Sequence, residues 1–247
     1  MNVYKTLLTA TLSILLVACN DSNNDNTLYV ATSADNPPYE HMRKGEIVGF
    51  DIDLINEIGK YLKKDIELKN VEFPGLLASL ASRNIDLVIA AMSVTEERQK
   101  KVDFSTPYTS SNIAVLFRSS DAFKSEKDLK GKIVGAQLGT TWSFIAHELS
   151  LKECFEDKSL ANNLMLVEEL KNQRIDAVIL EESQVQKFME KNQGLASFPL
   201  AQYNSRFAIT LPKNSALTPD INKAILALKN NGTIARLAQK WGLPNAQ

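Results

Sequence analysis

Residues 85–98 read Ile-Asp-Leu-Val-Ile-Ala-Ala-Met-Ser-Val-Thr-Glu-Glu-Arg, and the character of this stretch changes at Ser93. Its first half is a short apolar run rich in β-branched residues, which predicts a buried strand. In its second half, Thr95 is suited to be the N-cap of a helix that carries Arg98. Open α/β sheets bind ligands outside the carboxyl ends of their strands, where this stretch places its polar groups. The alternative is that Ser93 is an ordinary turn residue and Arg98 a solvated helix arginine.

The rest of the chain alternates between short apolar runs and segments of helical periodicity, which is typical of an α/β fold. We expect strands at 27–32, 66–71, 112–118, 131–136, 175–179 and 207–211. Helices are expected at 73–82, 163–172, 218–230 and 233–241, together with one that Asp51 caps and that extends to Leu62. The segments 84–89 and 174–179 agree at four of six positions. This repeat suggests two α/β lobes whose strand ends face a common cleft.

Composition narrows the functional classes. The 247 residues are 44% hydrophobic and 23% charged, which suits one or two soluble globular domains. A net charge of −1 gives no basic field, so we expect no nucleic acid partner. Two histidines and two cysteines are too few for a zinc cage or an iron–sulfur cluster. The glycine-rich phosphate motifs are absent as well, so we expect neither a metal nor a cofactor.

The N-terminus has the pattern of an exported protein. Residues 1–18 contain one lysine followed by an apolar run, which predicts a signal peptide too short to span a bilayer. Residues 16–19, Leu-Val-Ala-Cys, resemble the lipobox of bacterial lipoproteins, which implies cleavage before Cys19 and acylation of this cysteine. Residues 19–26 then form the lipidated cysteine and a polar tether. An ordinary secretory signal is the alternative; Cys154 is expected to be a buried, inert thiol.

Five further segments occur together: Ala-Thr-Ser-Ala-Asp-Asn-Pro-Pro-Tyr-Glu at 31–40, Gly-Phe-Asp-Ile-Asp-Leu at 49–54, Ser-Val-Thr-Glu-Glu-Arg at 93–98, Val-Asp-Phe-Ser at 102–105, and Asn-Gly-Thr through Lys-Trp at 231–241. In this order they resemble the amino-acid-binding receptors of ABC importers, the solute-binding proteins of family 3. The resemblance covers essentially the whole chain after the tether.

The resemblance implies an α/β fold with two Rossmann-like lobes joined by a two-strand hinge, the type II periplasmic binding protein. Lobe 1 would comprise residues 27–109 and 207–247, and lobe 2 residues 110–206, with hinge segments at both ends. Ligand binding would close the lobes by rotation about the hinge.

The implied function is that of an extracytoplasmic receptor that delivers a free L-amino acid to the membrane subunits of an ABC permease. The chain would be a monomer without enzymatic activity, held at the membrane by lipid on Cys19. Two or more acyl chains anchor a protein stably, whereas one does so only marginally.

The ligand carboxylate needs a cation with forked donors, because burying a charge without a partner is prohibitive. Arg98 resembles the carboxylate-binding arginine of the family and can bind bidentately. Backbone N–H groups of Ser93 and Thr141 would add donors, the latter at a helix N-terminus. The hydroxyl of Thr140 is a further candidate.

The ligand ammonium needs acceptors. The resemblance places the carbonyl of Ala91, the hydroxyl of Ser93 and the carboxylate of Glu181 around it. Relatives more often have aspartate at the Glu181 position, which puts the pocket geometry in doubt. The alternative is that Glu181 is solvated and Glu182 is the partner.

The side-chain subsite would be lined from both lobes by Ser33, Asn36, Phe73, Gln137 and Trp142. An aromatic at Phe73 suits a flat guanidinium or amide, which favours polar or basic ligands. Arginine is the first candidate, while glutamine, histidine and cystine remain open. Phe73 is alternatively a core residue, and Tyr39 and Glu40 are as easily structural as functional.

Two other functions fit the same resemblance. One is an enzyme related to the cyclohexadienyl dehydratases, in which Glu181 would act as general acid. The other is the amino-acid sensor domain of a signalling protein, although no apolar spanning segment follows Trp241.

Overall fold

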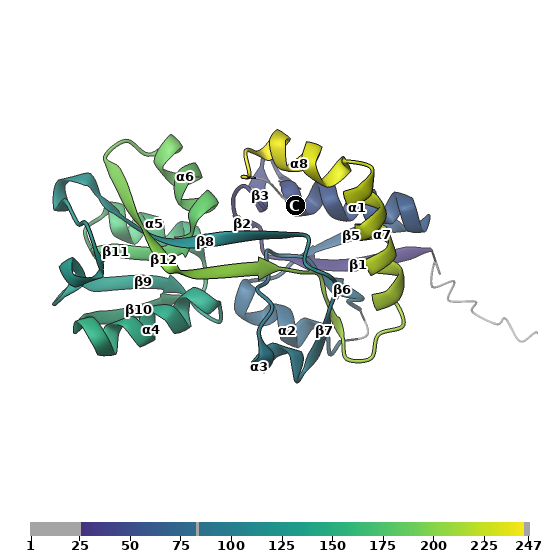
Figure 1. Ribbon diagram of the computed structural model, residues 1–247, viewed down its shortest axis with the longest axis horizontal. Helices are drawn as coiled ribbons and strands as arrows, with labels where there is room; N and C mark the ends of the chain where they lie inside the picture. Colours follow the sequence, from purple (N-terminus) through teal and green to yellow (C-terminus); the bar gives the residue numbers. More distant parts are fainter. Residues whose placement is uncertain (1–25, 83, 245–247) are drawn as a thin grey trace, which may run out of the picture.

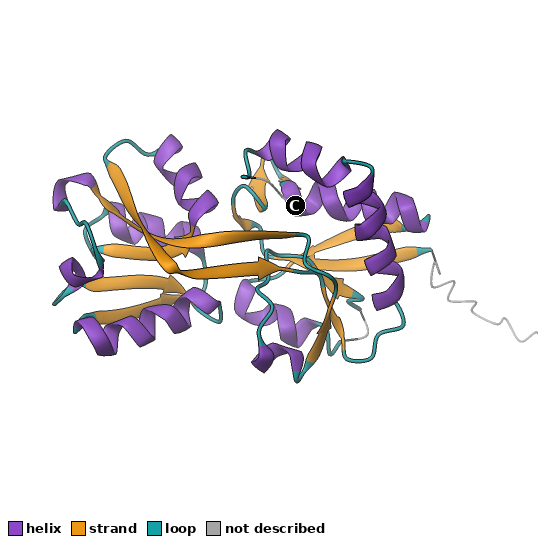
Figure 2. Ribbon diagram, viewed as in Figure 1, coloured by secondary structure: helices purple, strands orange, loops and turns teal. Residues whose placement is uncertain are grey.

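The computed structural model describes residues 26–82 and 84–244, and it has two lobes joined by two long strands (Figure 1). Each lobe is built on a five-stranded sheet. Figure 2 shows helices on both sides of the two sheets. None of the helices in these described ranges is long and apolar enough to cross a membrane. The signal peptide, Cys19 and most of the tether lie outside the described residues.

The sheet of lobe 1 is mixed. Its strands, in spatial order, are β5 (Asp65–Asn70), β1 (Thr27–Thr32), β6 (Leu87–Val88), β13 (Thr210–Pro212) and β7 (Val102–Phe104). β1 is parallel to both of its neighbours, whereas β13 is antiparallel to β6 and β7. Because β13 comes from the last quarter of the chain, both ends of the sequence contribute to this lobe.

Helices cover both faces of the lobe 1 sheet. One face packs against α1 (Phe50–Leu62), α7 (Thr218–Asn230) and α8 (Thr233–Trp241), and the other carries η1 (Phe73–Gly75), α2 (Leu76–Ser79) and α3 (Glu96–Gln99). The helix expected over 73–82 is therefore broken and ends early. The hydroxyls of Ser79 and Ser82 donate to backbone carbonyls three residues back, and such bonds compete with helix continuation.

The sheet of lobe 2 has the order β10 (Glu156–Leu160), β9 (Ile133–Gln137), β11 (Ala177–Glu181), β8 (Thr109–Arg118) and β12 (Leu195–Phe207). Helix α4 (Thr141–Glu153) covers one face, and α5 (Asn163–Lys171) and α6 (Glu182–Lys191) cover the other. Two 3₁₀ turns, η2 (Ser119–Asp121) and η3 (Glu126–Leu129), follow β8. A small antiparallel sheet of β2 (Asp35–Asn36), β3 (Glu40–Arg43) and β4 (Glu46–Val48) belongs to lobe 1.

The two connecting strands, β8 and β12, pair with each other from one lobe to the other (Figure 1). Their register is interrupted between Leu200 and Asn204, which divides a short ladder at Thr109–Asn112 from a longer one at Ile113–Arg118. Such an interruption bends a strand locally. The resemblance implied a connecting strand near residues 203–207, whereas β12 already begins at Leu195 and ends at Phe207.

Two further sequence expectations are wrong. Cys154 is exposed, not buried, because it ends α4 in a left-handed conformation at the surface (φ 58°). The N-cap of α1 is Gly49, not Asp51. Gly49 has a φ of 148°, and a Cβ there would lie 1.9 Å from the carbonyl oxygen of Tyr39, so only glycine fits. Asp51 is instead the second residue of the helix and turns inward.

The inward-facing Asp51 holds the segment that follows β6. Its Oδ2 atom accepts hydrogen bonds from the backbone N–H of Ala91 (2.7 Å) and the hydroxyl of Tyr108 (2.7 Å). Ala91 has a φ of 42°, a left-handed conformation that alanine rarely adopts, so this bond fixes a strained turn. Asp51 thereby ties the Ala91–Ser93 turn to the residue that precedes β8.

Asp51 also interacts with Glu40: each carboxyl shifts the pKa of the other, and Asp51 Oδ1 and Glu40 Oε2 have no other partner among the described residues. Both carboxyls are fully buried, and burial raises the pKa of Asp51 to about 6 and the pKa of Glu40 well above its usual range. A proton between the two carboxyls would remove their repulsion, and burial favours the protonated form of both. The amide of Asn36 donates to the other Glu40 oxygen (3.0 Å).

This pair predicts that stability falls as pH rises. The unfolded chain loses these protons near pH 4, whereas the folded chain holds them to about pH 6 or higher, so folding binds protons in this window. Glu40→Gln keeps an N–H donor facing Asp51 and removes one titrating group. We expect the decrease in unfolding free energy between pH 4 and pH 7 to shrink by about 1 kcal/mol or more. Chemical denaturation across this pH range measures it.

The matched control is Glu57→Gln, which alters an exposed carboxylate on α1 that pairs with Lys60. Its pH profile should follow that of the unmodified protein. If the unfolding free energy of the unmodified protein, Glu40→Gln and Glu57→Gln changed equally with pH, a proton shared by Asp51 and Glu40 would be contradicted.

Candidate functional site between the lobes

Arg98 lies where the two lobes meet. Thr95 caps α3 as predicted, its hydroxyl accepting the backbone N–H of Arg98 (3.2 Å). The guanidinium donates from Nη1 to the carbonyl of Ser93 (2.7 Å) and from Nη2 to the carbonyl of Gly139 in lobe 2 (2.9 Å). Arg98 is only 8% exposed, so it is not the solvated helix arginine of the alternative interpretation.

The charge of Arg98 has no acidic partner within residues 26–82 and 84–244. Burial lowers its pKa to about 10, so the guanidinium remains protonated at neutral pH. Two carbonyls satisfy some of its five N–H donors, and the rest can bind an anion. A buried cation whose neighbours are neutral is costly unless an anion joins it. This position therefore favours a bound carboxylate.

Phe73 lies beside Arg98. The guanidinium carbon is 5.8 Å from the centroid of the Phe73 ring, which is a cation–π distance. The ring is 7% exposed and belongs to the apolar cluster under α2. Phe73 is thus a core residue on one side and a support for Arg98 on the other.

A chain of hydroxyls joins the lobes next to Arg98. The Ser93 oxygen lies 3.1 Å from that of Thr141, which in turn lies 3.5 Å from that of Ser205. Thr141 is the first residue of α4, so the N-terminus of this helix faces Ser93. Thr140 is the N-cap: its hydroxyl accepts from Ser143 N–H (3.1 Å) and donates to the Gln137 carbonyl (2.6 Å).

Glu181 is fully buried at the same interface and is the N-cap of α6. Its carboxylate accepts the backbone N–H groups of Ser183 (2.9 Å) and Gln184 (2.8 Å). It also accepts the hydroxyl of Tyr39 from lobe 1 (3.2 Å) and that of Ser111. Burial raises its pKa. The neighbouring Glu182 points elsewhere, accepting from the side chain of Asn112 (3.0 Å).

Asp35 is a residue that the sequence analysis missed. It is 3% exposed, and its Oδ2 atom accepts from Gln137 Nε2 (2.8 Å) and from the backbone N–H of Asn163 (2.7 Å). The hydroxyl of Ser33 donates to Oδ1 (3.1 Å). Burial raises the pKa of Asp35 to about 6. Two predicted lining residues, Ser33 and Gln137, therefore converge on this carboxylate.

Three other predicted residues have local roles. The amide of Asn36 donates to Glu40, and its carbonyl oxygen has no partner among the described residues. Trp142 is 2% exposed and packs in the apolar core with α4, its indole N–H likewise without a partner among those residues. Ala91 donates its backbone N–H to Asp51. Glu40 is structural, whereas Tyr39 reaches Glu181.

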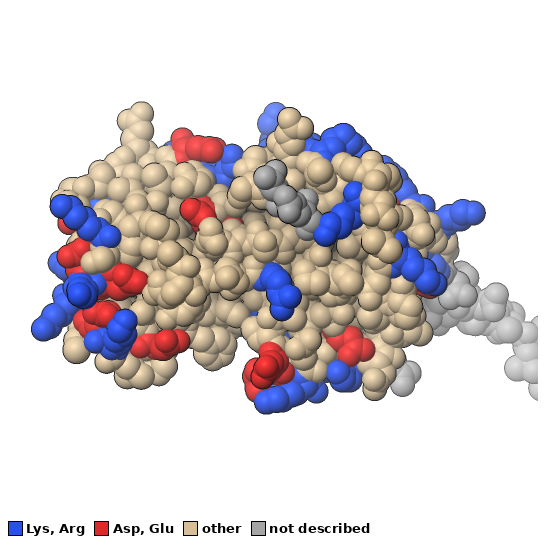
Figure 3. Space-filling view, viewed as in Figure 1, with Lys and Arg blue, Asp and Glu red and all other residues tan. Residues whose placement is uncertain are grey.

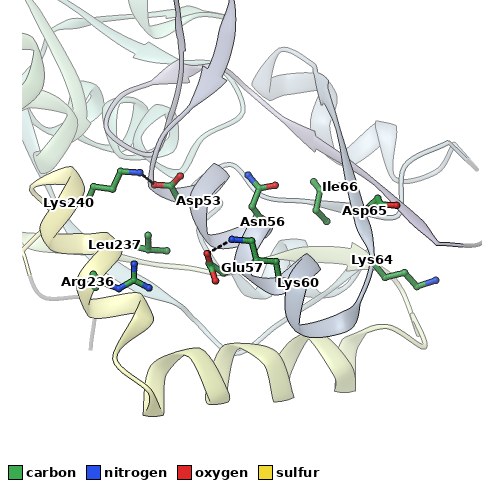
Figure 4. Close-up of a pocket in the computed structure, with 10 residues that line it drawn as sticks. All are labelled: Asp53, Asn56, Glu57, Lys60, Lys64, Asp65, Ile66, Arg236, Leu237 and Lys240. Carbon is green, nitrogen blue, oxygen red and sulfur yellow. Dashed lines mark hydrogen bonds and ion pairs between the residues drawn. The ribbon is translucent and has the colours of Figure 1, made fainter.

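Surface pockets lie elsewhere. One pocket, of about 520 Å³, lies on lobe 1 alone, between α1 and α8. Figure 4 shows its lining residues, among which Lys240 pairs with Asp53 (2.6 Å) and Lys60 with Glu57 (2.8 Å). A second, of about 350 Å³, is lined by α6 and by lobe 1 residues including His41 and Trp241. None of the predicted site residues lines either pocket. In Figure 3 the face over the connecting strands is mainly uncharged.

Comparisons with known proteins agree with this architecture. The family described as bacterial extracellular solute-binding proteins, family 3, matches residues 28–244. The arginine-binding extracellular protein ArtP of Bacillus subtilis (strain 168) is 34% identical over 243 residues, which are 95% of each chain.

Solved structures share the fold. An ancestral arginine-binding protein bound to glutamine is 37% identical, with a TM-score of 0.83 over 87% of this chain and 97% of that one. The ancestral amino acid-binding protein AncCDT-1, a precursor of cyclohexadienyl dehydratase, is 29% identical, with a TM-score of 0.80 over 88% and 96%. The family match spans both lobes and the strands between them, so this chain belongs to the bacterial extracellular solute-binding proteins, family 3.

Proposed function

We propose that this protein is an extracytoplasmic receptor that binds a free polar or basic L-amino acid and delivers it to an ABC transporter. The observation that carries the proposal is the buried guanidinium of Arg98, which lies between the lobes with only neutral hydrogen-bond partners. An amino acid supplies the missing anion and, on the same carbon, an ammonium for an opposing acidic group.

The ligand carboxylate would bind Arg98 in a bidentate manner. Thr141 supports this role, because the first N–H groups of α4 have no partner within the helix and favour an anion. The hydroxyls of Ser93 and Thr141 already lie within hydrogen-bond distance of each other across the interface. Both lobes would therefore contact the same carboxylate, and binding would favour their closure.

The ammonium would be neutralised by Glu181, with the Ala91 carbonyl and Ser93 hydroxyl as further acceptors. Glu181 is buried and no basic side chain of the described residues pairs with it. Its two backbone donors keep it ionisable despite burial. The ammonium would replace a hydroxyl donor, that of Tyr39 or Ser111, because the helix N-terminus occupies the other sites.

Arginine is the first candidate ligand. The choice is supported mainly by the relatives and less by the residues around the ligand side chain. ArtP is an arginine-binding protein, and the ancestral arginine-binding protein is also found with glutamine. Phe73, Asn36, Ser33, Gln137 and Trp142 are the proposed neighbours of the ligand side chain. Asn36 supports this assignment, since its buried carbonyl oxygen has no partner among the described residues.

The moving units would be residues 27–109 with 207–247 and residues 110–206. The break in the β8–β12 register supports a hinge there, because it leaves only a short ladder next to lobe 1. A monomer is proposed, since each lobe of one chain supplies groups to the site.

An enzyme of the cyclohexadienyl dehydratase type is the alternative, supported by the likeness to the precursor AncCDT-1 and by the raised pKa of Glu181. Against it, a general acid must hold a proton before it transfers one, whereas the backbone N–H groups at the start of α6 stabilise the ionised form of Glu181. A sensor domain is a second alternative. Incubation with prephenate-type substrates separates the enzyme from the receptor, because a receptor returns its ligand unchanged.

A ligand screen tests the receptor function. Each amino acid is added at saturating concentration and the thermal unfolding midpoint is recorded. A ligand at 100 times its dissociation constant should add about 2.7 kcal/mol to the stability of the folded state. We expect arginine to give the largest rise in midpoint, with a smaller set of polar ligands behind it. An equal response to all of them would contradict the proposal.

Arg98→Met tests the carboxylate contact. Methionine retains an unbranched apolar side chain against Phe73 but removes the charged donors. Because the ligand carboxylate then loses its partner, the affinity for every amino acid should fall at least about 100-fold, as measured by calorimetry. Arg98→Lys keeps the charge but lacks the two parallel N–H donors of arginine, so its affinities should lie between those of the unmodified protein and those of Arg98→Met.

Arg236→Met is the control for this series, because Arg236 is an exposed arginine on α8 that bonds within its own helix. Its affinities should remain unchanged. Retained binding by Arg98→Met would remove Arg98 from the site.

The lipid anchor at Cys19 is proposed from the lipobox-like sequence and is tested by a single change. Cys19→Ser should release the protein into the soluble extracytoplasmic fraction and abolish incorporation of radiolabelled palmitate. Cys154→Ser, which alters the other cysteine, should leave both unchanged. Labelling of Cys19→Ser would show that the anchor lies elsewhere.

A further inference from the structure

Asp35 connects β2 of lobe 1 to three segments of lobe 2. It receives Gln137 Nε2 at the end of β9 and Asn163 N–H at the start of α5, and its backbone carbonyl receives Gln184 Nε2 from α6 (3.4 Å). These contacts are buried. No other carboxylate of lobe 1 makes such contacts in the described part of the chain.

The contact with Asn163 completes the capping of α5. Asn162 is the N-cap, and its side chain accepts the N–H groups of Leu164 (2.9 Å) and Met165 (3.3 Å). The first helical N–H, that of Asn163, is left over, and Asp35 accepts it. One of the orphan donors of this helix is therefore satisfied by the opposite lobe.

Hydrogen bonds within lobe 2 orient the Gln137 amide toward Asp35. Its Nε2 also donates to the carbonyl of Ala161 (2.9 Å), and its Oε1 accepts from the Asn163 side chain (2.9 Å). These two bonds fix which way the amide points. Gln137 and Asn163 thus present two N–H donors at one point of lobe 2, and a carboxylate oxygen of lobe 1 fits between them.

We propose that Asp35 is a positioning residue that sets the closed arrangement of the lobes by completing the N-terminus of α5, independently of the ligand side chain. This inference rests on the proposed receptor function for its binding readout. Tyr39, four residues later, contacts Glu181 at the start of α6. One segment of lobe 1 therefore meets the N-termini of two helices of lobe 2.

Asp35→Ala leaves the donors of Gln137 and Asn163 without a partner in the closed arrangement. A buried donor without a partner opposes closure, so the affinities for arginine, glutamine and histidine should all fall about tenfold or more and by similar factors. Asp35→Asn retains one carbonyl acceptor and should show a smaller, equally uniform loss. Calorimetry with each of the three ligands measures these factors.

Hydrogen exchange measured without any amino acid tests the role of Asp35 separately from the proposed receptor function. Hydrogen exchange of the peptide that contains residues 161–167 should accelerate in Asp35→Ala, although the change lies in the other lobe. Asp103→Ala is the matched control, because Asp103 also accepts a backbone N–H, that of Asn214, but within lobe 1. This control should leave exchange at 161–167 and all three affinities unchanged.

The outcomes are distinct. Loss of affinity for arginine alone would make Asp35 a partner of the ligand side chain and overturn the inference. Unchanged exchange at 161–167 in Asp35→Ala would overturn it as well. If the unmodified protein binds no amino acid but Asp35→Ala still accelerates exchange there, the receptor function fails while the role of Asp35 stands.

Discussion

A guanidinium that is buried away from water needs other hydrogen-bond acceptors for its N–H groups. This requirement determines the arrangement of polar groups between the lobes. Arg98 satisfies part of it with one carbonyl from each lobe, Ser93 and Gly139. Carbonyls accept its N–H groups but do not cancel its charge. The arrangement is therefore complementary to an anion, and the helix N-terminus at Thr141 adds to the same preference.

Several other contacts between the lobes are also polar. Hydroxyl pairs, an amide with a carboxylate, and a tyrosine with a glutamate meet there. Polar groups of this kind can bond to water when they separate, so parting them costs far less than exposing an apolar core. The polar contacts therefore favour a reversible closure, although one apolar cluster continues from lobe 1 into lobe 2.

The sequence predicted local structure best where neighbouring residues determine it. A strand end, a threonine cap and an arginine stand next to one another in 85–98, and the structure has them as expected. The hinge part of β12 was expected only from the family resemblance, and its first part, from Leu195, was missed because its pairing with β8 is not visible in the local sequence. Asp51 and Asp35 were missed because their partners lie 40 and 128 residues away. Local rules carry no information about such pairs.

The position of β13 has a consequence for biogenesis. Lobe 2 is one uninterrupted stretch of chain, whereas the lobe 1 sheet keeps a place between β6 and β7 for a strand that is made near the end of synthesis. A chain that emerges from its N-terminus can complete the inserted lobe first, while the lobe that begins the sequence waits with a gap in its sheet. This nested order delays the completion of lobe 1 until the segment that forms β13 has been synthesised.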